Sequence, residues 1–226
     1  MPALAPGRVE RGIAVALGGA AALAVVGAGV DLGHQAQVLA SQRLLAAQGL
    51  ALARGDPVIH HAGRIAMDAP PVALVNAALI DARAAEASAD RGARKRLLAR
   101  AAWRIDRARG ARDRWGEAEV VAAYVAAAEA GTSGDARTLR LLATSYRDAP
   151  LLRHGGMWRV GVGLDHYSTL DLGTRRRIIE EGVLLARIDN ALRTAIFERA
   201  RTSAGYRPLL ARWHAARAGD ADRIAR

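Results

Sequence analysis

A run of 19 uncharged residues near the amino terminus, Gly12–Val30, constrains this chain more than any other feature. The run has no polar side chain and no proline. As an α-helix it would extend about 28 Å, close to the roughly 30 Å hydrocarbon core of a bilayer. It therefore predicts a transmembrane anchor, with the rest of the chain on one side of the membrane.

The charges on either side of this run predict its orientation. The leader, residues 1–11, carries Arg8 and Arg11, whereas no basic residue follows the run until Arg43. Because positive charge is retained in the cytoplasm, we expect a cytoplasmic leader and an exported remainder, in the periplasm of a bacterium. A cleaved signal peptide is the alternative, since residues 27–29 are small, but the run exceeds the roughly 7–15 residues of a usual signal core.

Small residues recur every fourth position along the run, at Gly12, Ala16, Ala20, Ala24 and Ala28. Such a stripe lets two membrane helices approach closely, so it suggests a homodimer. Twelve of the 19 residues are alanine or glycine, so the same stripe also arises by chance.

The end of the run has a second interpretation, as a strand leading into a dinucleotide-binding loop through Gly27, Gly29 and Gly33. That loop requires further βαβ units and an acidic residue about 20 positions on. Residues 48–50 are Gln, Gly and Leu, and the chain beyond has helical periodicity. We therefore predict no nucleotide site and no cofactor.

The remainder of the chain is expected to be all-α, as an array of short antiparallel helical hairpins. Of all 226 residues of the chain, 51% are hydrophobic but only 4% are aromatic, and alanine, the best helix former, dominates the apolar set. Apolar periodicity and Gly or Pro breaks predict one helical domain over 31–218 and a frayed tail over 219–226. The expected helices are 32–54, 58–68, 72–88, 93–105, 117–129, 135–148, 174–188, 192–203 and 206–218.

Within residues 57–130 the chain resembles tetratricopeptide-type (TPR) repeats. Ala93, Leu97 and Ala101 are similar to the small-large-small pattern of the second repeat helix, and Pro70 or Pro71 to its closing proline. Arg100 occupies the expected alanine site, and the first-helix signature is missing. The resemblance implies a TPR-like α-solenoid that binds proteins, with an irregular bundle as the alternative.

A second block, Ser145–Leu192, resembles a segment of small single-span helical proteins in bacterial envelope and polysaccharide systems. The resemblance implies an accessory protein of surface-polysaccharide production or secretion, and it implies no reaction. The residues that carry it are Tyr146, Pro150, Trp158, Arg159, Leu170, Asp171, Arg175 and Glu180.

No set of residues predicts a catalytic or metal site. The chain has no cysteine, and neighbouring His60 and His61 would point about 100° apart on a helix. Asp165, His166 and Ser168 are adjacent in sequence, which does not build a catalytic triad, so we expect capping or turn roles. The close glutamate pairs, 117 with 119 and 180 with 181, are expected to lie on solvated helix faces.

The most informative polar feature is the basic segment Arg91–Arg114, in a chain of net charge +11. On a helix, four of its arginines form one row opposite Leu97, Ala101 and Ile105. Such a row suits phosphate or carboxylate ligands, and Trp103 and Trp115 could stack on sugars or lie at a lipid interface. A solvated face with both tryptophans in the core is the simpler interpretation. The row consists of Arg96, Arg100, Arg104 and Arg107.

These observations predict a non-enzymatic, membrane-anchored helical scaffold of the bacterial envelope that docks a protein partner. The alternative is a basic domain that binds anionic lipid, acidic polysaccharide or nucleic acid through its arginine row. Export of the domain argues against nucleic acid, so topology decides between these classes.

Overall fold

The computed structural model describes the backbone of residues 8–56, 62–152 and 155–224, and the side chains of 31–56, 62–152 and 155–219. Over this backbone the chain is helical and has no strand, which confirms the all-α prediction. The elements are α1 (Arg8–Arg54), η1 (Ala62–Arg64), α2 (Pro71–Ala87), α3 (Arg91–Gly110), α4 (Gly116–Ala130), α5 (Ala136–Asp148), α6 (Gly156–Asp165), η2 (Tyr167–Thr169), α7 (Leu172–Ile188), α8 (Asn190–Ala200) and α9 (Tyr206–Ile224).

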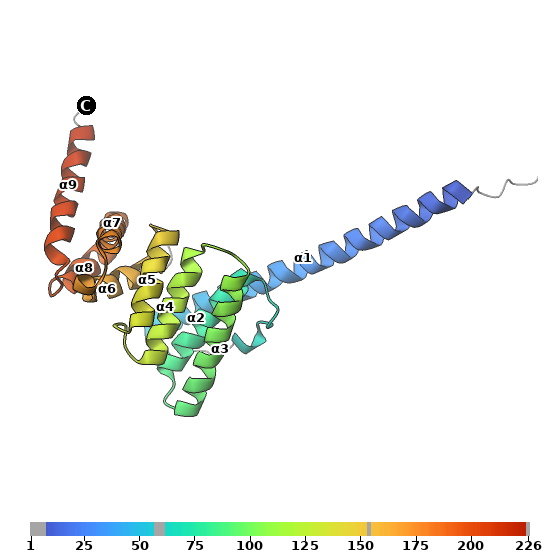
Figure 1. Ribbon diagram of the computed structural model, residues 1–226, viewed down its shortest axis with the longest axis horizontal. Coiled ribbons are helices and arrows are strands. Elements are labelled where there is room, and N and C mark those ends of the chain that lie inside the picture. The colour runs from blue at the N-terminus through green and yellow to red at the C-terminus, as the bar shows by residue number, and fades with distance from the viewer. Residues whose placement is uncertain (1–7, 57–61, 153–154, 225–226) are drawn as a thin grey trace, which may run out of the picture.

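Helix α1 is a single helix of 47 residues, about 70 Å long, whose amino-terminal part projects from the body (Figure 1). Its carboxyl-terminal part packs against α2, where Val38, Leu44 and Leu45 contact the core. The helix ends at Gly55, which adopts a left-handed φ of 72° that favours glycine. The helix thus runs without a break from the projecting part into the body.

The predicted anchor Gly12–Val30 lies within α1, but its side chains are outside the described residues, as is the small-residue stripe. None of the helices whose side chains are described is both long enough and apolar enough to cross a membrane. Residues 24–33 are helical throughout, so the strand and turn of a dinucleotide loop are not formed there.

A first hydrophobic core is built by α2, α3 and α4, with residues of η1 and α1 packed against it. Alanine fills much of its centre, and Ala73, Ala77, Ala101 and Ala118 are completely buried. Small side chains let helix axes approach closely, so a core with little bulk still packs densely. The alanine-rich composition is therefore used for close helix packing as well as for helix formation.

A second core lies between α5, α6, α7, α8 and α9. Leu142, Ile178, Ile196 and Leu209 are among its fully buried aliphatic side chains, with Tyr146 in the same core. Helix α4 packs against α5, and α5 contacts α7, so the two cores follow one another along the body (Figure 1).

Aspartate side chains begin four of the helices. Asp90, Asp135, Asp171 and Asp189 accept hydrogen bonds from backbone N–H groups of α3, α5, α7 and α8. The predicted cap at Asp135 is confirmed, with its Oδ2 accepting from Arg137 N at 2.8 Å.

Several sequence-based boundaries are wrong. Helix α3 continues to Gly110, beyond the expected end at residue 105, and α8 ends at Ala200, before the expected residue 203. Of the expected helix 58–68, residues 58–61 lie outside the described part, and the rest contains only the short turn η1. The next helix begins at Pro71. The tail predicted to fray from residue 219 is helical as far as Ile224, since α9 continues past Gly219.

Candidate functional site

The predicted arginine row of α3 does not lie on one solvent-facing stripe. Arg104 is buried, with a side-chain exposure of 1%. Its Nη1 donates to Asp81 Oδ2 at 2.6 Å, and its Nη2 donates to the carbonyls of Ala62 and Ile65 at 2.7 and 3.1 Å. Arg104 is therefore not accessible to a ligand, because α2 and the 62–65 segment cover it.

Arg100 is also engaged, through two parallel hydrogen bonds to Asp81. Its Nε donates to Asp81 Oδ2 at 2.8 Å and its Nη2 to Asp81 Oδ1 at 2.6 Å. These bonds raise the pKa of Arg100, whereas burial lowers the pKa of Arg104. Both guanidiniums stay charged at neutral pH, and they share one carboxylate. The cluster carries a net positive charge at the edge of the first core.

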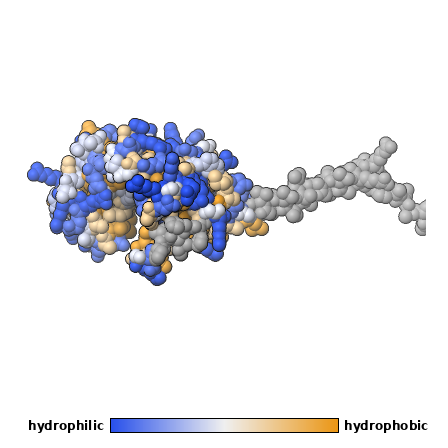
Figure 2. All heavy atoms as spheres, turned by 90° about the horizontal axis from the view of Figure 1, so that it is seen from below, coloured by the Kyte–Doolittle hydropathy of each residue, from blue (hydrophilic) through white to orange (hydrophobic). Residues whose placement is uncertain are grey.

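Arg96 and Arg107 remain on the outside of α3. The Arg96 side chain is 76% exposed, and its Nη2 lies 3.9 Å from Asp90 Oδ2. Arg107 is exposed and lies 5.9 Å from the ring centroid of Trp103, which is itself 41% exposed. Lys95 is exposed beside them. Figure 2 shows a largely hydrophilic face of the body with apolar patches between the charged groups.

The second tryptophan of the segment and its glutamates have structural positions. Trp115 is buried and donates from Nε1 to Glu117 Oε2 at 2.8 Å. Glu119 was expected on a solvated face, but it is buried and accepts from Arg109 Nε at 2.7 Å. Trp115 therefore lies in the core, as the simpler interpretation expected, whereas Trp103 is at the surface.

A second buried ion pair joins α6 to α7, at Arg159 and Glu181, both with 0% side-chain exposure. Arg159 Nε donates to Glu181 Oε2 at 2.8 Å, and Nη2 donates to Oε1. The prediction that Glu181 lies on a solvated helix face is therefore wrong. Its neighbour Glu180 does form the expected exposed i,i+4 pair, with Arg176 at 2.9 Å.

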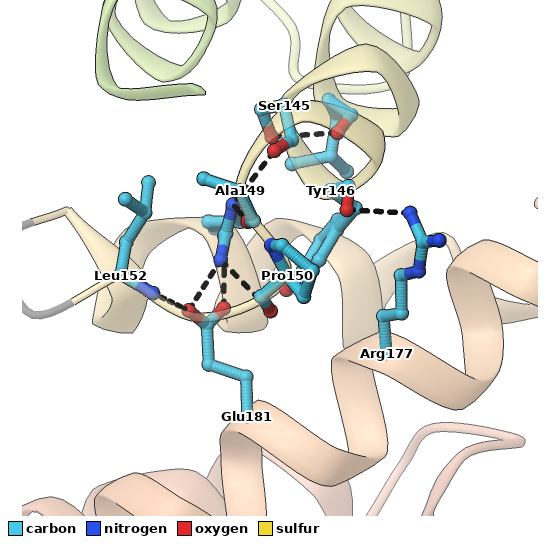
Figure 3. Close-up of polar contacts among 9 residues, drawn as sticks. Ser145, Tyr146, Ala149, Pro150, Leu152, Arg177 and Glu181 are labelled. Carbon is cyan, nitrogen blue, oxygen red and sulfur yellow. Dashed lines mark hydrogen bonds and ion pairs between the residues drawn. The ribbon is translucent and has the colours of Figure 1, made fainter. Parts of the chain in front are cut away.

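The same arginine binds the carboxyl end of α5. Arg159 Nη1 donates to the carbonyls of Ser145 and Ala149 at 3.2 and 2.8 Å, and Nη2 to that of Pro150 at 3.3 Å. Glu181 Oε1 accepts from Leu152 N at 2.7 Å, so Glu181 reaches the loop after α5 (Figure 3). A guanidinium at a helix carboxyl end satisfies carbonyls that have no partner within the helix.

Tyr146 completes this cluster from α5. The Arg159 guanidinium carbon lies 4.0 Å from its ring centroid, and Arg177 Nη1 donates to its carbonyl at 2.5 Å (Figure 3). Burial, and then the Glu181 carboxylate, raise the pKa of the Tyr146 hydroxyl well above its ordinary value. The contacts of this cluster join α5, α6 and α7.

His166 does not assemble with its sequence neighbours. Its Nε2 lies 3.1 Å from Ser133 Oγ on the α4–α5 loop. Asp165 Oδ1 accepts a hydrogen bond from Arg199 Nε at 3.0 Å. Ser168 accepts from Arg175 through its carbonyl. In the described part of the chain, no three His, Asp or Glu residues are placed to hold a metal ion; His60, His61 and His154 lie outside that part.

The described residues form surface hollows, of which two are considered. One, of about 220 Å³, opens between α2, α3, α4, the α4–α5 loop and α6, beside Ser133. The other, of about 400 Å³, is lined from η2, α7 and α9 by Tyr167, Arg176, Ile179, Glu180, Pro208 and Arg212. The first combines aromatic and polar side chains that the sequence separates by up to 72 positions, from Glu86 to Trp158, so no local pattern indicated it.

No protein-family model, no curated protein and no solved structure matches this chain. The arrangement of the described residues supplies surface cations on α3, two buried ion-pair clusters and hollows lined by aromatic and polar side chains.

Proposed function

We propose that this protein is a membrane-anchored helical scaffold of the bacterial cell envelope, without catalytic activity, that holds a protein partner. The observation that carries the proposal is the continuity of α1. The apolar run Gly12–Val30 leads without a loop into the part of α1 that packs on α2. A flexible linker would let the body tumble, whereas a continuous helix sets its orientation to the anchor.

Polar contacts support this rigid mounting. Gln48 Nε2 donates to the carbonyl of Ile80 at 3.0 Å, and Asn76 Nδ2 donates to Ser41 Oγ at 3.0 Å. Both bonds join α1 to α2, and Gln48 is almost fully buried. Buried side-chain hydrogen bonds define one register of helix packing, because any slip would leave their polar groups without partners.

The TPR-like part of the proposal is supported by how the helices succeed one another. Helix α2 contacts both α3 and α4, α6 contacts both α7 and α8, and α7 contacts α9. Contacts between helices two positions apart in the chain are expected when helical hairpins stack. Such stacks provide extended surfaces for protein partners, and an irregular bundle is the competing arrangement.

The proposal is tested by fusing a reporter that is active only in the periplasm after Arg226, and by fractionating the cells. We expect reporter activity and recovery in the inner-membrane fraction. The double variant Ala20→Arg with Val25→Asp places charges within the apolar run and should release the protein from membranes. Ala36→Arg, on an exposed position of α1 beyond the run, is the matched control and should stay bound. An inactive reporter on a protein recovered in the membrane fraction would reverse the topology, and recovery of the unchanged protein in the soluble fraction would contradict the anchor.

A second candidate function is binding of anionic lipid or acidic polysaccharide by the exposed cations of α3. Lys95, Arg96 and Arg107 are the members that remain at the surface, next to Trp103. Their reversal to glutamate should abolish binding to anionic vesicles or glycans without disturbing the Asp81 cluster. Reversal of three exposed arginines outside α3, Arg140 and Arg147 on α5 and Arg207 on α9, is the control for net charge. Equal losses in both variants would indicate only unspecific attraction.

A further inference from the structure

The 220 Å³ hollow lies where α6 of the second core meets the first group of helices. Its residues come from five segments of the chain. They include Glu86 of α2, Arg94 of α3, Tyr124 of α4, Thr132 and Ser133 of the α4–α5 loop, and Trp158 of α6. A hollow of this size is smaller than the roughly 300–1,000 Å³ of sites for drug-sized ligands. It is suited to a single ring.

Two aromatic side chains form one wall of the hollow. The rings of Tyr124 and Trp158 meet edge to face, with centroids 5.3 Å apart and an interplanar angle of 69°. Both side chains are half-buried, so they are held in place while part of each remains accessible. Rigid aromatic side chains of this kind provide apolar contact area with little loss of conformational entropy.

Polar groups of both kinds surround this wall. The Glu86 carboxylate accepts a hydrogen bond from the Tyr124 hydroxyl, and Arg94 Nη2 donates to the Ala128 carbonyl at 3.3 Å. Thr132 Oγ1 accepts from Gly134 N at 3.2 Å, and Ser133 Oγ is joined to His166 Nε2. These bonds order the polar groups without using all of their donors and acceptors, since a carboxylate, a guanidinium and a hydroxyl each have several.

The mixture of groups discriminates between classes of ligand. A simple anion would be attracted by Arg94 but repelled by Glu86, and a simple cation would be attracted by Glu86 but repelled by Arg94. A purely apolar ligand would cover both charges without giving them partners. A ring that has apolar C–H faces and hydroxyl groups at its edge satisfies the wall and the polar groups together.

We propose that this hollow binds one sugar ring of an oligosaccharide, with Tyr124 and Trp158 against the ring and Glu86, Arg94, Thr132 and Ser133 at its hydroxyl groups. The site goes beyond the proposed anchoring and partner docking and does not depend on either. A ligand here would contact both groups of helices, so binding would also restrain α6 against α4.

The test uses the full chain in lipid nanodiscs, free of glycoside detergents. Saturation-transfer NMR is recorded with three probes: a neutral hexose trisaccharide, an N-acetylhexosamine trisaccharide and a trigalacturonate. We expect saturation transfer and a saturable titration for at least one probe. The absence of binding for all three would overturn the proposal, and it would leave the fractionation result for the anchor unaffected.

Three variants locate the binding. Thr132→Trp fills the hollow from an exposed loop position and should abolish the signal. Glu86→Ala, also at an exposed position, should weaken binding about tenfold, the factor expected for a lost hydrogen bond to a charged group. Thr202→Trp places the same side chain on the exposed turn between α8 and α9, outside the hollow, and should bind normally. Circular dichroism verifies folding, and binding that survives Thr132→Trp or is lost in Thr202→Trp would contradict the proposal.

Discussion

Arg104 and Asp81 form an ion pair inside the first core, with guanidinium Nη1 and carboxylate Oδ2 2.6 Å apart and each side chain only 1% exposed. The pair connects α3 to α2, and the same guanidinium reaches the carbonyls of Ala62 and Ile65. A residue that the amino-acid pattern assigned to the surface therefore holds three segments together.

Loss of the Asp81 charge should destabilise the protein strongly. Asp81→Asn keeps the size of the side chain but leaves the buried Arg104 without its counter-charge, at an expected cost of about 3–5 kcal/mol. Urea unfolding followed by circular dichroism measures the change. Asp106→Asn, which removes an exposed partner of Arg109 at 3.6 Å, should cost less than about 1 kcal/mol. Similar losses in the two variants would contradict the structural role of Asp81.

The neighbouring glutamates of α7 provide a matched comparison in the second core. Glu181→Gln removes the charge opposite the buried Arg159 and should cost about 3–5 kcal/mol in unfolding free energy. Glu180→Gln removes only the exposed pair with Arg176 and should cost about 0.5 kcal/mol or less. Thermal unfolding of both variants distinguishes them, and a larger effect at Glu180 would show that the burial of Glu181 is wrong.

Close packing of α6 on α7 makes Gly163 sensitive to any side chain. A Cβ atom at this position would lie 2.6 Å from Ile178 Cδ1 and 2.7 Å from its Cγ1. Gly163→Ala should therefore destabilise the protein by about 1–3 kcal/mol through overpacking. Gly33→Ala in α1, where nothing lies within 4 Å, should instead be neutral or stabilise by up to about 1 kcal/mol. A stable Gly163→Ala variant would indicate a looser contact between the two helices.

The cap of α7 should contribute to the pH dependence of stability. Asp171 accepts from Thr174 Oγ1 at 2.6 Å and from Thr174 N at 3.0 Å, and these bonds lower its pKa below the ordinary 3.8. Because the folded-state pKa is the lower one, the stabilisation is present above about pH 4 and is lost as the pH falls through the folded-state value.

Asp171→Asn isolates this contribution, because asparagine still caps a helix but does not titrate in this range. Urea unfolding measured from about pH 6 down to about pH 2.5 should show a smaller loss of stability in the variant than in the wild type. Parallel curves would mean that the carboxylate form of Asp171 adds nothing to the folded state.

The burial of charged side chains was the property least predictable from the sequence. Asp81 stands in the apolar sequence of α2, and that position was the one local signal of a buried carboxylate. Arg104, Arg159 and Glu181 carry no such signal, because arginine and glutamate are ordinary residues of solvated helix faces. Their ion-pair partners lie 22 or 23 positions away in the chain.

The sequence by itself determined that this protein is all-α, where most of its helices begin and end, and which aspartate starts α5. These properties depend on groups within a few residues of one another, such as the Asp135 carboxylate and the N–H of Arg137. Only the tertiary structure decided which face of α3 and α7 is covered, which aromatic rings share the hollow, and where α1 joins the body. Those outcomes depend on packing between distant segments, because a helix face is exposed or buried according to what lies against it.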